Sequence, residues 1–266
     1  MTDSQRALAG HNLRVYESKS VVGGYFDQEK LFPAEAALLA RIAAGLPEMR
    51  MLDIGIGGGR TTLHFAERAK EYIGIDYSAA MVQACHTRFP SPPASVSFRV
   101  GDVRDLSAFP DGAFDLVLFS YNGLDYIPHE DRLAGLAEMR RVTKPGGYLC
   151  FSSHNLVGLG RGPGHGAPHA FGSFSLRRLL IRALIFACNG SLAALRAGDH
   201  AVVRDDGCGF RLRTYYVRPS EQLRRLTDLG LGQVEIYGSD GLAIEASVSD
   251  DVSDEWLYYL AKTPIP

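Results

Sequence analysis

The sequence has few cysteines, no excess of charge of either sign and no long apolar run. Its four cysteines form no C-x-x-C pair, which fits reduced, packed thiols in the cytoplasm. The 28 basic and 30 acidic residues leave a net charge of −2, without the basic excess of a nucleic-acid-binding protein. The most apolar stretch, 179–188, is interrupted by Arg182 and is too short to span a bilayer. We therefore expect a cytoplasmic protein that binds neither nucleic acid nor a membrane.

Strand-like apolar segments alternate with helical segments over the first 153 residues. This alternation predicts an α/β doubly wound fold, a mostly parallel sheet with helices on both faces. A chain of 266 residues is long enough to bury a core as one domain with an insertion. Beyond this part, glycine and proline predict a loop over 155–172. Residues 175–188 are expected to form an amphipathic helix, and 190–213 to be irregular.

The stretch MLDIGIGGGRTT, residues 51–62, places four glycines directly after an apolar strand. Glycine weakens regular elements, so this group predicts a turn that a ligand approaches closely. A strand, a glycine turn and a helix start form a corner whose free N–H groups attract polar or anionic ligands. The dinucleotide pattern G-x-G-x-x-G would require glycine at position 60, where this chain has Arg60. Asp53, just before the turn, disfavours a pyrophosphate and suits an amino or sulfonium group.

A second acid, Asp76, ends the next apolar strand, and its carboxylate is suited to accept from both hydroxyls of a ribose. Together with these acids, the motifs resemble those of the class I S-adenosylmethionine-dependent methyltransferases that act on small molecules. The resemblance is carried by D-x-G-x-G-x-G from Asp53, by GIDYS at 74–78, and by the blocks at 98–103, 114–122 and 140–147, which stand in family order. A match of several ordered blocks is far more specific than a lone glycine motif.

The resemblance implies a Rossmann-like sheet of seven strands, with a cap insertion before the last helix and strands. It implies S-adenosylmethionine as the cofactor and S-adenosylhomocysteine as the product. The residues that it places at the cofactor are Asp53, Gly55, Gly57, Gly59, Asp76, Tyr77, Asp102, Val103 and Ser120.

Four segments follow from the same resemblance. Residues 33–153 are expected to form the cofactor-binding core, and 217–266 to complete it with a helix and a final antiparallel strand pair. Residues 154–216 are expected to form the cap over the acceptor site. Residues 1–32 form an arm that either closes over the cofactor as a lid or packs on the sheet as an ordinary helix.

The acceptor half of the site is predicted from the segment after the fourth strand and from the cap. The sequence SYNG at 120–123 differs from the D/N-P-P-Y/F motif of the N6-adenine methylases, which argues against that activity. His154, at the end of the fifth strand, is either a general base or a loop histidine bonded to backbone. Tyr121 is the second catalytic candidate. The substrate-binding candidates are Tyr25, Asn122, Asn155, Tyr215 and Tyr216.

Two further features are less specific. Arg60 either reaches the carboxylate of the cofactor or is an exposed arginine of the first helical turn. His165 and His169 are spaced like helical metal ligands, but the glycines around them disfavour a helix, and no third ligand is nearby. We therefore expect no metal site.

From these patterns we predict a methyltransferase that acts on an oxygen or nitrogen of a small-molecule metabolite. The alternative is a protein with the methyltransferase fold that binds the cofactor but serves as a non-catalytic partner or scaffold. Intact cofactor motifs and a long cap favour the enzyme, although a function taken from a fold remains an analogy.

Overall fold

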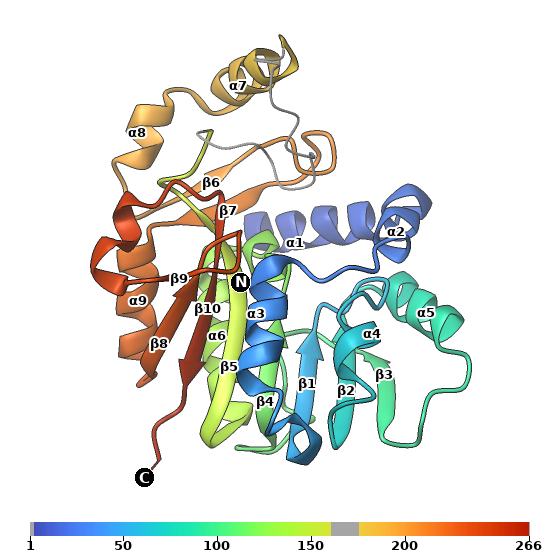
Figure 1. The fold of residues 1–266 in the computed structure, drawn as a ribbon. Helices are drawn as coiled ribbons and strands as arrows, with labels where there is room; N and C mark the ends of the chain where they lie inside the picture. The colour runs from blue at the N-terminus through green and yellow to red at the C-terminus, as the bar shows by residue number, and fades with distance from the viewer. Residues whose placement is uncertain (1–2, 161–175, 266) are drawn as a thin grey trace.

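The computed structural model describes residues 3–160 and 176–265, and its centre is one ten-stranded sheet (Figure 1). Its strands are β1 (Arg50–Ile54), β2 (Glu71–Asp76), β3 (Val96–Val100), β4 (Phe114–Phe119), β5 (Thr143–Asn155), β6 (His200–Val203), β7 (Thr214–Val217), β8 (Gly232–Tyr237), β9 (Ala243–Ile244) and β10 (Trp256–Lys262). The main strand order is β3-β2-β1-β4-β5-β10-β8-β9. β1 to β5 pair in parallel, whereas β10 is antiparallel to both β5 and β8. The doubly wound, mostly parallel fold and the final antiparallel pair are therefore confirmed.

Helices cover both faces of this sheet (Figure 1). The α-helices are α1 (Asp3–Tyr16), α2 (Lys19–Phe26), α3 (Pro33–Ile42), α4 (Thr62–Phe65), α5 (Ala79–Arg88), α6 (His129–Val142), α7 (Leu176–Asn189), α8 (Leu192–Arg196) and α9 (Pro219–Asp228), and the 3₁₀ helices are η1 (Leu46–Glu48), η2 (Gly123–Tyr126) and η3 (Ala246–Asp251). Met51 packs with α3 and α5, whereas its neighbour Leu52 packs with α6 and α9. Successive side chains of a strand point to opposite faces, so each buried strand contributes side chains to the hydrophobic cores on both faces of the sheet. None of the helices within residues 3–160 and 176–265 is long and apolar enough to cross a membrane.

The sheet is wider than the seven strands expected from the sequence. β7 adds a parallel pairing at the end of β5, with His154 opposite Tyr216, and β6 then pairs antiparallel with β7. The prediction that 190–213 is irregular is wrong, because this segment contains α8 and β6. A strand of four residues is too short to show a clear period, and its partner β7 is distant in the sequence. The expected helix over 175–188 is confirmed as α7.

The N-terminal arm lies directly on the glycine loop. α1 and α2 run across the edge of the sheet where the parallel strands end (Figure 1). A Cβ atom added to Gly58 would lie 2.6 Å from the backbone nitrogen and Cα of Phe26, and one on Gly57 would lie 3.1 Å from the ring of Tyr25. The absence of side chains at these glycines therefore leaves the space that the arm occupies.

We predict that Gly58→Ala weakens the docking of the arm. The added methyl group would overlap the backbone of Phe26, and overpacking of this kind costs about 1–3 kcal/mol. Thermal unfolding should shift downward, and limited proteolysis should cleave within residues 3–32 faster than in the wild type.

The matched control is Gly24→Ala in α2, where an added Cβ meets nothing within 4 Å. Because alanine is a better helix former than glycine, this variant should be neutral or slightly stabilising. Equal protease resistance of the Gly58→Ala variant and the wild type would show that the arm is not held by this contact.

Two stacked histidines fasten the cap strand β6 to α6. The rings of His129 and His200 lie 4.4 Å apart with their planes 9° from parallel. Tyr215 packs against both rings, and its hydroxyl lies 2.9 Å from Nδ1 of His129. Burial lowers the pKa of both imidazoles, and nearby Arg225 lowers the pKa values further. Both rings are therefore neutral at neutral pH.

We predict that β6 opens more readily in acid. Because the folded pKa values lie below the ordinary value of 6.5, the opened form binds more protons, and the contact is fully stable only above that value. Hydrogen exchange of amides 200–203 should speed up between about pH 7.5 and about pH 5.5, after correction for intrinsic rates. His200→Gln should reduce this response. An unchanged response in that variant would contradict the role of the histidine pair.

Candidate functional site

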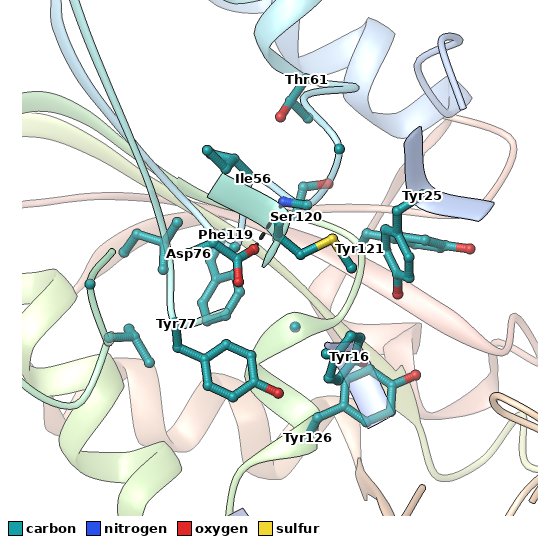
Figure 2. Close-up of a pocket in the computed structure, with 18 of the residues that line it drawn as sticks. Tyr16, Tyr25, Ile56, Thr61, Asp76, Tyr77, Phe119, Ser120, Tyr121 and Tyr126 are labelled. Carbon is teal, nitrogen blue, oxygen red and sulfur yellow. Dashed lines mark hydrogen bonds between the residues drawn. The ribbon is translucent and has the colours of Figure 1, made fainter. Parts of the chain in front are cut away.

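A cavity of about 900 Å³, measured with its open mouth, lies at the carboxyl ends of β1, β2 and β4 (Figure 2). Open α/β sheets bind ligands at this edge. The sequence-predicted residues that line the cavity are Gly55, Gly57, Asp76, Tyr77, Asp102, Val103, Ser120, Tyr25 and Tyr121. The predicted residues outside its lining are Asp53, Gly59, Asn122, His154, Asn155, Tyr215 and Tyr216.

Asp76 is the buried acid of the cavity wall. Its carboxylate accepts hydrogen bonds from the backbone N–H of Gly57 at 3.0 Å, the dashed contact in Figure 2, and from that of Ser78 at 2.9 Å. Burial raises the pKa of Asp76 to about 6, although both N–H groups act to lower it. The acid thus fixes the glycine loop on one side and still faces the cavity.

Asp53 supports the loop from behind. Its carboxylate accepts hydrogen bonds of 2.6 Å from the hydroxyls of both Thr61 and Tyr72. Burial raises the pKa of Asp53 to about 6, against the lowering effect of these two hydroxyls. Gly59 also faces away from the cavity, because a Cβ atom there would meet the ring of Phe89 at 2.8 Å. Both residues therefore shape the site without lining it.

Asp102 and Val103 line the cavity after β3. The side chain of Asp102 is 32% exposed and forms an ion pair with Arg104 at 2.5 Å, and Arg104 also pairs with Asp131. Arg104 thus holds the Asp102 carboxylate in a fixed orientation at the cavity. Tyr77 lies on the same side of the cavity as Asp76 (Figure 2).

A buried ion pair that the sequence did not reveal lies beside the glycine loop. Arg60 is buried and donates to both carboxylate oxygens of Glu35, so the exposed position considered for it is wrong. Its guanidinium stacks between the rings of Phe32 and Tyr121. Ser120 donates its hydroxyl to Glu35 as well. A sequence pattern could have indicated a role for Glu35, because it lies three residues after Phe32. Its carboxylate accepts a hydrogen bond from the N–H of Phe32, as in a capping box.

Tyrosine rings enclose the rest of the cavity. Tyr16 and Tyr25 come from the arm, and Tyr77, Tyr121 and Tyr126 come from the segments after β2 and β4 (Figure 2). Burial raises the pKa of all five tyrosines, so their hydroxyls are neutral. Such walls offer apolar ring faces with few neutral polar groups, as small-molecule sites commonly do.

His154 lies behind this wall. Its Nδ1 is 2.9 Å from Oδ2 of Asp125, and its Nε2 is 3.4 Å from Nδ2 of Asn122. Its ring is 6.0 Å from that of Tyr126, which lines the cavity. The histidine is therefore one residue removed from the cavity.

The other three substrate candidates have partners of their own. The amide of Asn155 bonds to the backbone of Val252 and Val157. Tyr215 contacts His129, and the hydroxyl of Tyr216 donates to Asp205 at 2.9 Å. His165 and His169 lie outside the described residues.

The charges of the lining fit a cationic nucleoside. Asp76 and Asp102 are its acids, and the charge of Arg60 is compensated by Glu35. A dinucleotide would bring two more negative charges next to these carboxylates, whereas a sulfonium would add a positive one. Asp76, at the end of β2, is a buried acid that lines the cavity. The residues present thus fit S-adenosylmethionine.

Comparison with known sequences gives a consistent result. The family described as the methyltransferase domain matches residues 51–147. A probable methyltransferase, ltbC, of Aspergillus luteorubrus is 42% identical over 108 residues, which is 37% of this chain and 38% of that protein. The ubiquinone biosynthesis O-methyltransferase of Alkalilimnicola ehrlichii is 31% identical over 123 residues, 46% of this chain and 49% of that protein. The chain thus matches less than half the length of these curated relatives.

Solved structures share the fold over most of the chain. The 1,6-didemethyltoxoflavin-N1-methyltransferase of Burkholderia thailandensis has a TM-score of 0.60 at 14% identity, covering 99% of this chain and 91% of that one. An S-adenosylmethionine-dependent methyltransferase of Mesorhizobium loti has a TM-score of 0.57 at 18% identity, covering 86% and 97%. Residues 51–147 thus match a methyltransferase domain, and the chain as a whole has the Rossmann-like fold of S-adenosylmethionine-dependent methyltransferases.

Proposed function

We propose that this protein transfers a methyl group from S-adenosylmethionine to an oxygen or nitrogen of a small molecule. The observation that carries the proposal is that the glycine loop and Asp76 open into the same cavity as the ring of tyrosines. Relatives and structural neighbours are consistent with either acceptor atom, since one is named an O-methyltransferase and another an N1-methyltransferase.

The cofactor half of the cavity has a role for each group. The backbone of Gly55 and Gly57 lines the space for the methionine part, Asp76 accepts from the ribose, and Tyr77 with Asp102 and Val103 surrounds the adenine. When bound, S-adenosylmethionine supplies a methyl group to a lone pair of the acceptor and leaves as S-adenosylhomocysteine. The protein's contribution is then to orient the acceptor and to exclude water.

The tyrosines form the acceptor half. Tyr25 and Tyr121, with ring centroids 5.7 Å apart, close the side of the cavity that faces the arm. The arm covers the glycine loop, so it would enclose a bound cofactor as a lid. Because the ring faces are neutral and apolar, they suit a planar, uncharged acceptor. His154 is the proposed proton acceptor, reached past Asn122 and Tyr126.

The function is tested with two measurements. S-adenosylmethionine or S-adenosylhomocysteine should raise the melting temperature, because a ligand that binds only the folded state stabilises it, and NAD should not. A panel of phenols, catechols and aromatic amines is then incubated with methyl-labelled S-adenosylmethionine. Label transfer supports the enzyme. Stabilisation by the cofactor, with no transfer to any acceptor of the panel or of a metabolite extract, favours the non-catalytic scaffold.

We predict that Asp76→Ala severely weakens cofactor binding. The ribose hydroxyls would lose a charged acceptor in a buried place, and each such bond is worth about 1.5–3 kcal/mol. Isothermal calorimetry with S-adenosylhomocysteine measures the loss. Asp111→Ala, at a carboxylate that is 83% exposed and remote from the cavity lining, is the matched control. Unchanged affinity in a folded Asp76→Ala variant would remove this acid from the site.

Cofactor affinity should also depend on pH. The pKa of Asp76 is about 6 in the free protein, and the ribose hydroxyls donate to the ionised carboxylate. Affinity should therefore be constant above this value and fall by about tenfold per unit below it. Calorimetry across this range checks the slope, and a flat profile down to about pH 5 would contradict the assignment.

A further inference from the structure

We propose that Asp125 is a positioning residue that fixes His154 as the Nδ1–H tautomer. Nε2 of His154 is then left unprotonated and faces the amide of Asn122, whose neighbours Tyr121 and Gly123 line the cavity. The role of this proton transfer rests on the proposed function, whereas the tautomer itself does not.

The carboxylate of Asp125 is completely buried and surrounded by donors. Oδ1 accepts from Nε of Arg132 at 3.2 Å and from the hydroxyl of Ser153 at 2.9 Å. Oδ2 accepts from the backbone N–H of His154 at 2.6 Å and faces its Nδ1 at 2.9 Å. With a guanidinium on one oxygen, the carboxylate is the acceptor in each contact. The proton between Oδ2 and the ring therefore belongs to Nδ1.

The other side of the ring is consistent with this assignment. Nε2 of His154 lies 3.4 Å from Nδ2 of Asn122, which is a donor, so Nε2 is the acceptor there. Oδ1 of the same amide is buried and has no hydrogen-bond partner among the described residues. A half-turn of the amide would bring this oxygen to Nε2. The imidazolium formed after proton uptake would then find an acceptor.

Asn122 belongs to a strained turn of the cavity wall. It follows Tyr121, and these two residues have φ angles of 57° and 58°, in the left-handed region that bulky residues rarely adopt. The hydroxyl of Ser152 accepts from the N–H of Asn122 at 2.7 Å and holds this turn. Strain of this kind persists where the surroundings fix it, often at functional sites. Tyr121 and Gly123, on either side of Asn122, both line the cavity.

Asp125 would not need this arrangement if it served Arg132 alone. A counter-ion for the guanidinium requires only the contact to Oδ1. Two contacts instead go to His154, one to its backbone and one to its ring, which fixes both the position and the rotation of the imidazole. In methyl transfer, the acceptor would lose its O–H or N–H proton as the new bond to carbon forms, and Nε2 would take up this proton from one residue behind the cavity lining, past Asn122. Such proton removal contributes about 10²–10⁴-fold.

The first test is made on the wild-type protein without cofactor or acceptor. Nitrogen-15 NMR of histidine-labelled protein at alkaline pH distinguishes protonated from unprotonated ring nitrogens. The signals of His154 are identified by their loss in His154→Gln. We expect a protonated Nδ1 and an unprotonated Nε2. A protonated Nε2, or an average of both tautomers, would overturn the proposal whatever the protein catalyses.

Variants then separate positioning from folding. Asp125→Asn should lose the fixed tautomer, whereas Ser153→Ala, which removes a different contact of the same carboxylate, should keep it. If Asp125→Asn fails to fold because Arg132 loses its partner, the spectra of the wild type and of Ser153→Ala still show whether His154 is the Nδ1–H tautomer. A retained Nδ1–H tautomer in folded Asp125→Asn would contradict the role of Asp125.

The effect on catalysis is measured as kcat with the best acceptor from the panel. His154→Gln can still contact Asn122 but accepts no proton near neutral pH. Its kcat should fall by about 10²–10⁴-fold, with unchanged affinity for S-adenosylhomocysteine. Wild-type kcat in this variant would show that the fixed imidazole takes no part in proton transfer. If the wild-type protein does not bind S-adenosylmethionine or S-adenosylhomocysteine, the proposed function is contradicted, whereas the NMR result on the tautomer still holds.

Discussion

The close approach of the N-terminal arm to the glycine loop is the constraint on which the site depends. The loop has two kinds of contact: the N–H of Gly57 donates to Asp76, and the backbone of Phe26 packs on Gly58. Neither glycine has room for a side chain, because a Cβ on Gly57 would meet the ring of Tyr25 and one on Gly58 would meet the backbone of Phe26. A single run of glycines therefore joins the first two strands of the sheet to a segment that precedes them in the chain. The cavity exists because these parts meet there.

Buried acids are the second organising feature, and the donors that hold them are of three kinds. Asp76 is bonded by backbone N–H groups, Asp53 by hydroxyls, and Glu35 and Asp125 by arginines. A buried carboxylate is expensive unless it is paired or fully hydrogen-bonded. Of these four acids, Asp76 alone lines the cavity, and it is held by uncharged backbone N–H groups, whereas an arginine compensates the charge of Glu35. The two acids of the motif therefore differ in place, since Asp76 lines the cavity and Asp53 lies behind the glycine loop.

Sequence motifs predicted many of the residues that line the cavity, because these residues lie within a few positions of the ends of strands. Gly55 and Gly57 follow β1 closely, and Asp76 is the last residue of β2. Glu35 and Arg60 could not be paired from the sequence, since their contact depends on how α3 packs against the sheet. Tyr215 was placed at the acceptor by its position in the cap, yet its ring packs against His129. Contacts between distant segments were thus the part that local patterns could not supply.

The cap contacts both the arm and His154, the proposed base. β7 pairs with the last two residues of β5, so the strand that carries His154 also carries the cap. The ring of Tyr216 lies 4.9 Å from that of His154, and its hydroxyl bonds to Asp205 within the cap. On the other side, the ring of His11 in the arm bonds to the backbone oxygen of Arg211 in the cap. A displacement of this segment would therefore disturb contacts of both His11 and His154. In the proposed reaction, enclosure of the acceptor and placement of the base would then depend on the same contacts.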